Sequence, residues 1–164
     1  MAAAAEPTAA RSAGRRADEA LDTGEISHVV GYLLAIASVT TREHYHASVG
    51  RPFDLRPVEF TLLMLLRGNP GASPKQLGRA LRMPAPNVTA LLDRMVARGL
   101  VERRRSATDG RALEVRLTAD GEATAQRTHE ISLSMEDPLL ERFTPGERVL
   151  LRELLLRLGP GAAA

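Results

Sequence analysis

Cysteine and tryptophan are both absent from this chain of 164 residues. Without cysteine there is no disulfide, no thiolate metal site and no thiol-based redox switch. No run of about 18 apolar residues occurs, so the sequence predicts no transmembrane helix. Residues 1–22 are rich in alanine and arginine but lack the continuous apolar core of a signal peptide. We therefore expect a cytoplasmic protein that needs no cofactor and no metal.

Lysine is nearly absent too, because 21 of the 22 basic residues are arginines. Their distribution along the chain is uneven. Between Ser73 and Thr118 ten basic and four acidic side chains give a net charge of +6, so the rest of the chain carries −4 of the total of +2. Such an asymmetry is typical of a protein that binds a polyanion. The alternative is a solvated, arginine-rich surface without a partner.

Two segments before residue 70 have the apolar spacing of helices. Asp22 followed by Glu25 predicts a capping box that opens the first helix, which extends to about His46. Pro57 suits the first turn of a second, strongly apolar helix that ends at Gly68. The segment between them, VGRPFDLRP, interrupts the helical pattern.

Two shorter helices follow, separated by a tight turn. We expect Ser73 to cap the first, with a proline in its first turn and Gln76 reaching back to the cap. Pro84 and Pro86 break the chain and begin a new helix, which Gly99 closes. The apolar residues expected to face inward from the two helices are Leu77, Ala80, Leu81, Val88, Leu91, Leu92 and Met95. Two such helices form a helix-turn-helix.

A β-hairpin is predicted directly after this pair of helices. LVERRR and ALEVRL are two short runs joined by turn-forming residues, with Asp109 and Gly110 at or near the tip. In the second run Leu113, Val115 and Leu117 alternate with polar residues, the period of a half-buried strand. The predicted fold class is therefore mainly α with a small β-hairpin wing, a winged helix-turn-helix flanked by further helices.

The run from Leu77 to Thr118 resembles the winged helix-turn-helix of the MarR family of bacterial transcriptional regulators. The family's DNA-reading helix ends in D-R-[ML]-x-x-[RK]-G-L-V-x-R, and this chain has DRMVARGLVER from Asp93 to Arg103. The family's wing carries D-x-R before L-T-x-x-G, and this chain has DGR at 109–111 and LTADG at 117–121. Several motifs in the same order make the resemblance specific, and it extends weakly into both flanking segments.

The resemblance implies a homodimer held together by the N- and C-terminal helices. Independently, Thr144 to Glu147 forms a capping-box pattern, and the helix that follows has an apolar face too wide for a lone amphipathic helix. Pro138 is expected to kink or break the helix that begins after Thr118. A two-fold dimer would hold its DNA-reading helices about 34–36 Å apart and read an inverted repeat.

These expectations divide the chain into four parts. Residues 1–22 are a flexible tail, and residues 23–52 form an N-terminal dimerisation helix. Residues 53–118 are the winged helix-turn-helix DNA-binding domain, and residues 119–160 form the C-terminal dimerisation helices.

The outward face at the start of the DNA-reading helix is expected to enter the major groove. Pro86, Asn87, Thr89 and Ala90 lie on it. Asn87 can make two hydrogen bonds to adenine, or it can instead cap the helix; Thr89 can meet a phosphate or a thymine methyl. Family members often have small hydroxyl residues at this turn and arginine at the position of Ala90. Few donors therefore face the bases here, and selectivity leans on DNA shape and the wing.

Phosphate contacts are expected on both sides of this helix. Ser73, Lys75 and Gln76 stand at a helix N-terminus, which favours an anion. Arg94 is either a phosphate contact or an intramolecular ion-pair partner. Side chains alternate along a strand, so Arg103 and Arg105 are expected on the DNA side and the arginine between them on the other.

Arg111 at the wing tip is the best single candidate for a DNA contact, because a guanidinium group suits the narrow, negative minor groove of A·T-rich DNA. Asp109 would be repelled by phosphate. The resemblance implies that it holds the turn with Gly110 and orients a neighbouring arginine.

No enzyme is expected, since the chain has no serine elbow, no phosphate-cradling glycine loop and no metal-spaced Cys/His set. Two histidines two residues apart, at 44 and 46, point in different directions on a helix. The remaining alternative is a winged helix whose basic wing contacts an acidic protein. Steep salt dependence of binding to an inverted-repeat duplex would separate the two functions.

The resemblance also implies a small aromatic or phenolic effector bound between the dimer helices and the DNA-binding region. The residues proposed to bind it are Tyr32, His44, Tyr45, His46, Arg51, Phe53 and Phe60. They are alternatively core or surface residues with no effector. Our hypothesis is a homodimeric, sequence-specific DNA-binding regulator, a repressor released by such a ligand, in the bacterial cytoplasm and associated with the nucleoid through its operator.

Overall fold

The computed structural model describes residues 21–105 and 113–159. The chain divides into two compact units between Ser38 and Val39, and each is described by itself. In the first unit the carboxylate of Asp22 accepts a hydrogen bond from the backbone N–H of Gly24 at 2.9 Å, which leads into a 3₁₀-helix, η1 (Gly24–Ile26). Helix α1 (Val30–Tyr45) begins only after this turn and crosses the unit boundary. The predicted capping box with Glu25 is wrong, because Asp22 bonds the backbone two residues on.

The second unit begins with the end of α1, which continues into a π-helix, η2 (His46–Gly50). Helix α2 (Pro57–Gly68) follows the interruption, with Pro57 in its first turn as predicted. The carboxylate of Glu59 accepts a hydrogen bond from the backbone N–H of Arg56 at 2.9 Å, which satisfies one backbone donor at the start of the helix.

The helix-turn-helix consists of α3 (Pro74–Leu81) and α4 (Ala85–Ala97). The Ser73 hydroxyl accepts from the N–H of Gln76 at 3.3 Å, and the Gln76 side chain accepts from the N–H of Ser73 at 2.8 Å, so the predicted cap is confirmed. Gly99 follows α4 with a φ of +68°, a backbone conformation that favours glycine. Of the residues expected to face inward, only Ala80 is exposed. Leu77 and Leu81, four residues apart, already occupy the narrow inner face of so short a helix.

The wing is an antiparallel hairpin of β1 (Val101–Arg105) and β2 (Leu113–Leu117), with Val101 opposite Leu117 and Arg105 opposite Leu113. Val115 is buried and also pairs with Ala72 in an isolated bridge, which joins the hairpin to the loop before α3. Leu113, at the outer end of β2, is 40% exposed. The predicted alternation of inward and outward side chains therefore holds in the part of β2 next to the core, but not at Leu113.

Three helices complete the second unit: α5 (Ala119–Ser132), α6 (Asp137–Leu140) and α7 (Pro145–Leu158). The helix after Thr118 ends at Ser132, so Pro138 does not kink it. The proline lies in the first turn of α6, where a backbone N–H would have no partner within the helix, so its absence costs nothing. The predicted capping box of Thr144 and Glu147 opens α7. None of the helices in residues 21–105 and 113–159 has the length and apolar character to cross a membrane.

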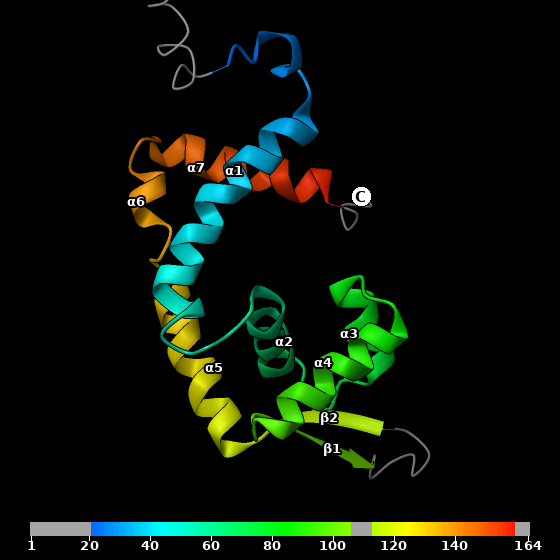
Figure 1. Cartoon of the computed structure of the whole chain (residues 1–164). Helices are drawn as coiled ribbons and strands as arrows, with labels where there is room; N and C mark the ends of the chain where they lie inside the picture. The colour runs from blue at the N-terminus through cyan, green and yellow to red at the C-terminus, as the bar shows by residue number, and fades with distance from the viewer. Residues whose placement is uncertain (1–20, 106–112, 160–164) are drawn as a thin grey trace, which may run out of the picture. The chain divides into compact units, whose positions relative to one another are not determined.

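The core of this unit lies where α2, α4, α5 and the hairpin meet (Figure 1). Its buried residues come from each of these elements, from the end of α1, from η2 and α3, and from two connecting segments. They are Tyr45, Val49, Leu55, Leu62, Leu63, Leu66, Leu77, Val88, Leu91, Leu92, Met95, Leu100, Val101, Val115 and Ala125. A mainly helical fold with a two-stranded wing confirms the predicted fold class.

Candidate nucleic-acid interface

The start of α4 presents a continuous exposed face. Pro86, Asn87, Thr89 and Ala90 are all exposed, whereas Val88 among them and Leu91 directly after them are buried. This division confirms the predicted sides of the helix. Figure 1 shows the hairpin running alongside α4, so a surface that meets one of them can meet both.

Asn87 does not cap the helix. The N-cap position belongs to Pro84, and no side chain caps α4 there, so that alternative is wrong. The Thr89 hydroxyl donates to the carbonyl of Ala85 at 3.1 Å, one turn back. Its methyl group and the two acceptor lone pairs of its oxygen are left for a ligand, while both polar groups of the exposed Asn87 amide are suited to contact a base.

Arg103 joins the wing to α4. Its guanidinium group lies 2.7 Å from the carboxylate of Asp93 and donates to the backbone carbonyl of Thr89 at 3.3 Å. Because only 30% of its side chain is exposed, Arg103 holds the strand against the helix as well as contributing positive charge. The sequence prediction assigned it to phosphate alone and did not identify Asp93 as its partner.

The neighbouring arginines on β1 have different surroundings, as the alternation of a strand requires. Arg104 pairs with Glu102, two residues earlier on the same face, at 2.6 Å. Arg105 is exposed at the end of the strand. Asp109, Gly110 and Arg111 lie outside the described residues, so their roles at the wing tip stay sequence predictions.

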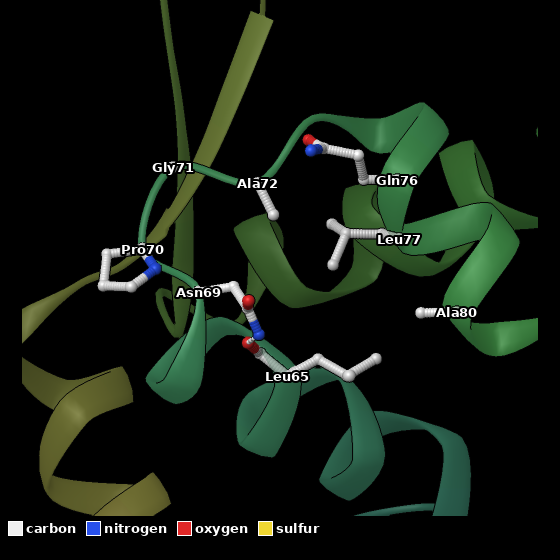
Figure 2. A pocket seen from close by; sticks show the side chains of 8 residues that line it. All are labelled: Leu65, Asn69, Pro70, Gly71, Ala72, Gln76, Leu77 and Ala80. Carbon is white, nitrogen blue, oxygen red and sulfur yellow. Dashed lines mark hydrogen bonds between the residues drawn. The ribbon is translucent and has the colours of Figure 1, made fainter. Parts of the chain in front are cut away.

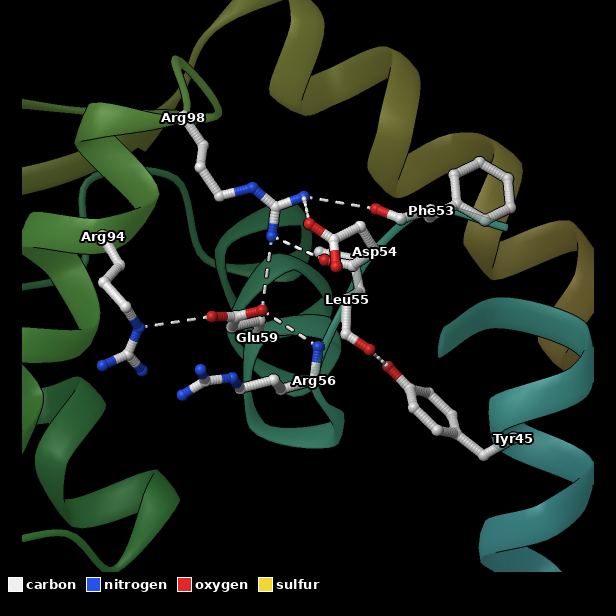
Figure 3. Close-up of polar contacts among 8 residues, drawn as sticks. All are labelled: Tyr45, Phe53, Asp54, Leu55, Arg56, Glu59, Arg94 and Arg98. Atoms are coloured by element: carbon white, nitrogen blue, oxygen red, sulfur yellow. Dashed lines mark hydrogen bonds and ion pairs between the residues drawn. The ribbon is translucent and has the colours of Figure 1, made fainter. Parts of the chain in front are cut away.

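A buried carboxylate links α2 to α4. Glu59 is 3% exposed, and besides capping α2 it contacts two arginines of α4 (Figure 3). The Nε of Arg94 and the Nη1 of Arg98 each lie 3.4 Å from one of its oxygens. An ionised carboxylate out of water needs this many partners, since leaving it unpaired costs several kcal/mol, on the order of 3–5. Of the two roles considered for Arg94, the intramolecular ion pair is therefore formed, and 43% of the Arg94 side chain stays exposed.

The N-terminus of α3 is less open to an anion than its sequence suggested. Ser73 and Gln76 bond each other, and the N–H of Gln76 is occupied by that cap. Lys75, between them, is exposed. Beside this turn a hollow of about 370 Å³ lies between α2, the loop 69–72 and α3, where Figure 2 shows Leu65, Ala72 and Leu77 around the same space.

The residues proposed to bind an effector are divided between the two units. Tyr32 lies in the first unit and the other six in the second. Tyr45 is buried, donates a hydrogen bond from its hydroxyl to the carbonyl of Leu55 at 3.0 Å, and stacks at a tilt on Phe60 with ring centroids 5.8 Å apart. Burial, and secondarily the negative charge of Glu59, raise the pKa of Tyr45 to about 12. These contacts are those of a core residue.

The other candidates are spread around this core. Phe53 is partly buried, and the guanidinium carbon of Arg127 lies 5.1 Å from its ring centroid. His44 is half-buried, and His46 and Arg51 are exposed.

A second hollow, of about 620 Å³, opens between α2 and α5. Phe60 is the one member of the proposed set that lines it; the other lining residues, which the sequence reasoning missed, are Met64, Arg67, Gly68, His129 and Ser132. Residues 60, 64, 67 and 68 recur at helical spacing and therefore share a face of α2, a signal visible in the sequence. No sequence pattern showed that this face lies beside His129, some sixty residues later.

The elements and the exposed face of α4 define a winged helix-turn-helix protein. Residues 53–112 match the sequence profile of the MarR family. An HTH-type transcriptional repressor of Mycobacterium tuberculosis is 29% identical over 130 residues, which is 79% of this chain and 93% of that protein. The multiple antibiotic resistance protein MarR of Escherichia coli K12 is 29% identical over 110 residues, 66% of this chain and 76% of that one.

Among solved structures, the transcriptional repressor CouR bound to a 23-mer DNA duplex is 33% identical, with a TM-score of 0.78 over 85% of this chain and 99% of that one. The chain belongs to the MarR family of DNA-binding transcriptional regulators. The relatives named here are regulators and not enzymes.

Proposed function

We propose that this protein is a homodimeric repressor that binds an inverted-repeat operator through α4 and the wing, and that a small aromatic ligand releases it. The observation that carries the proposal is the exposed face of α4, which lies beside the hairpin and is joined to it by the ion pair between Arg103 of β1 and Asp93 of α4. The similarity to a repressor solved on duplex DNA supports it, since that similarity covers 99% of the repressor chain. No feature of the described residues favours an acidic protein partner instead.

The DNA contacts expected from the sequence are kept as part of this proposal. The residues proposed to contact DNA are Ser73, Lys75, Gln76, Pro86, Asn87, Thr89, Ala90, Arg94, Arg103, Arg105 and Arg111. Of these, the outward face of α4 would supply base contacts, and the basic side chains would neutralise phosphates. Arg94 and Arg103 would do so only with the part of their side chains that their carboxylate partners leave exposed.

Helix α7 supports a dimer. Six of its large apolar residues are between 44% and 69% exposed, namely Val149, Leu150, Leu154, Leu155, Leu156 and Leu158. Apolar patches of this kind on a monomer mark an interaction surface. A second copy related by a two-fold axis would cover them in both subunits at once. We assign dimerisation to residues 23–52 and 119–160 and DNA binding to residues 53–118.

The hollow between α2 and α5 supports a small aromatic effector. Phe60 and Met64 offer apolar surface for a ring, while Arg67 and His129 offer polar groups for a carboxylate or a phenol. Arg67 already donates to the side chain of Gln126 at 2.7 Å, which holds its guanidinium group at the hollow. The protein would act in the cytoplasm, where its operator is.

Selection of bound fragments from random duplex DNA tests the function directly. We expect a two-fold symmetric site to be enriched, and binding to that site to weaken steeply with salt as phosphate-bound counterions are released. A panel of aromatic and phenolic acids is then added to the complex, and one or more should release the DNA. If no symmetric site is enriched, the proposed function is wrong.

Arg111→Ala tests the minor-groove contact within that function. We expect operator binding to weaken by about 1–3 kcal/mol with the dimer intact by size-exclusion chromatography. Unchanged affinity would remove Arg111 from the interface without affecting the role of α4.

A further inference from the structure

Arg98, at the C-terminal end of α4, is held by more contacts than any DNA-facing arginine of the described residues. Its Nη1 donates to the backbone carbonyl of Asp54 at 2.7 Å, and its Nη2 donates to that of Phe53 at 3.2 Å. Nη1 also lies 3.4 Å from the carboxylate of Glu59, and Nη2 lies 3.8 Å from that of Asp54 (Figure 3). A planar guanidinium group with this many acceptors fixes both distance and direction.

The loop that receives Arg98 is itself anchored from several sides. The Leu55 side chain is 2% exposed, and its carbonyl accepts the hydrogen bond from Tyr45. Phe53 lies under the guanidinium group of Arg127 from α5. Asp54, between them, has a φ of +49°, in the left-handed region that aspartate adopts more readily than most non-glycine residues, and its side chain is exposed. Arg98 therefore connects α4 to a loop that is anchored to the core on either side of Asp54, through Phe53 and Leu55.

Because α4 is long, a small change in its tilt at the Arg98 end displaces the residues at its start. Asn87 precedes Arg98 by 11 residues, and at a rise of about 1.5 Å per residue about 16 Å separates them along the helix axis. A tilt of about 5° at the anchored end would move Asn87 by roughly 1.4 Å. Hydrogen bonds to bases need donor–acceptor distances of about 2.7–3.2 Å, so such a displacement would break them.

We propose that Arg98, together with Glu59, is a positioning residue that sets the angle at which α4 presents its outward face to DNA. The inference rests on the proposed function that α4 reads an operator. Arg98 acts at the end of the helix opposite Asn87 and Thr89, and it makes no DNA contact itself. Its loss therefore weakens operator recognition more than it weakens the non-specific attraction to phosphate.

The test compares binding to the selected operator with binding to a scrambled duplex of equal length, each over a range of salt concentrations. Four full-length variants are measured beside the wild type: Arg98→Ala, Arg98→Lys, Glu59→Gln and Arg142→Ala. Arg142 is an exposed arginine between α6 and α7 and controls for the loss of one positive charge. Because it lies in the segment assigned to dimerisation, its affinities are compared with those of the wild type at equal measured dimer concentration. Thermal unfolding and the fraction of binding-competent dimer are recorded for each protein, so that a loss of folded protein is not read as a loss of affinity.

For Arg98→Ala we expect operator binding to weaken about tenfold and scrambled-duplex binding to weaken less than about twofold, with the salt slope unchanged. Arg98→Lys should recover part of the loss, since an ammonium group can still donate to the loop carbonyls. Arg142→Ala should keep the wild-type ratio of the two affinities. A direct phosphate contact would instead lower the salt slope by about 1 and weaken both duplexes alike.

Two results would overturn the inference: an unchanged ratio of the two affinities in Arg98→Ala, whether or not both affinities fall, or a lower salt slope. If Arg98→Ala does not fold, Glu59→Gln decides, because the amide oxygen can still cap α2 while the charge that faces Arg98 is gone. A lower operator-to-scrambled ratio then supports the inference, and the wild-type ratio overturns it. If the wild type itself binds no symmetric site, the proposed function has failed, which is a separate result.

Discussion

Gly121→Ala is the substitution whose effect on stability the structure determines most directly. Gly121 lies in the first turn of α5, at the end of the LTADG motif. A Cβ placed there would stand 1.9 Å from the carbonyl oxygen of Leu100 and 2.9 Å from its carbonyl carbon. Carbon and oxygen atoms normally approach no closer than about 3.3 Å, so α5 or the start of β1 must move by more than about 1 Å.

That movement disturbs the junction between the wing and α5. The carbonyl of Leu100 accepts a hydrogen bond from the N–H of Thr118 at 3.2 Å, and the Thr118 hydroxyl accepts from the N–H of Gly121 at 3.0 Å. The added Cβ meets a backbone carbonyl, which, unlike a side chain, cannot move away by changing rotamer. Overpacking of about 1–3 kcal/mol and the strained hydrogen bond, about 1 kcal/mol, outweigh the gain in helix propensity, about 1 kcal/mol, so we expect the free energy of unfolding to fall by about 2 kcal/mol.

Urea unfolding followed by circular dichroism measures this change. The protein concentration is held fixed, because the stability of a dimer depends on it. Gly146→Ala in α7 is the matched control, since its added Cβ meets nothing within 4 Å and should change stability by less than about 1 kcal/mol. A loss below about 0.5 kcal/mol in Gly121→Ala would refute the close approach of α5 to Leu100.

Three further predictions concern Tyr45, α7 and the wing arginines. Stability should fall as the pH rises from 10 to about 12, because the folded protein keeps a phenolic proton on Tyr45 that the unfolded chain has lost, and Tyr45→Phe should remove this part of the fall. Leu155→Glu should convert the proposed dimer to a monomer in sedimentation velocity, because it puts a charge into the exposed apolar face of α7. Arg105→Ala should lower the salt slope of operator binding by about 1, and Arg103→Ala by less, because Asp93 already neutralises Arg103.

Each of these has a result that contradicts it. An identical alkaline unfolding profile in Tyr45→Phe would mean that the phenol is solvated in the folded state. A dimer that survives Leu155→Glu would place the subunit interface elsewhere. Equal slopes for the two arginine variants would mean that the pair with Asp93 opens on DNA.

Much of the fold could be predicted because its signals act over a few residues. The caps at Ser73 and Thr144, the stop at Gly99 and the alternation in β2 each depend on neighbours at most four positions away. The same locality explains one wrong prediction. Asp22 and Glu25 have the spacing of a capping box, but the side chain of Asp22 found a nearer backbone donor two residues on.

The sequence by itself determined the longer helices, the hairpin, their order and the outward face of α4, since hydrophobic periodicity and capping are properties of a short stretch of chain. Only the tertiary structure decided which charges are free to meet DNA. Glu59 and Arg94 are 35 positions apart, and Arg98 and Asp54 are 44 apart, so no local pattern could pair them. The hollow at His129 and the approach of Gly121 to Leu100 arise in the same way, because packing brings together residues that the chain keeps distant.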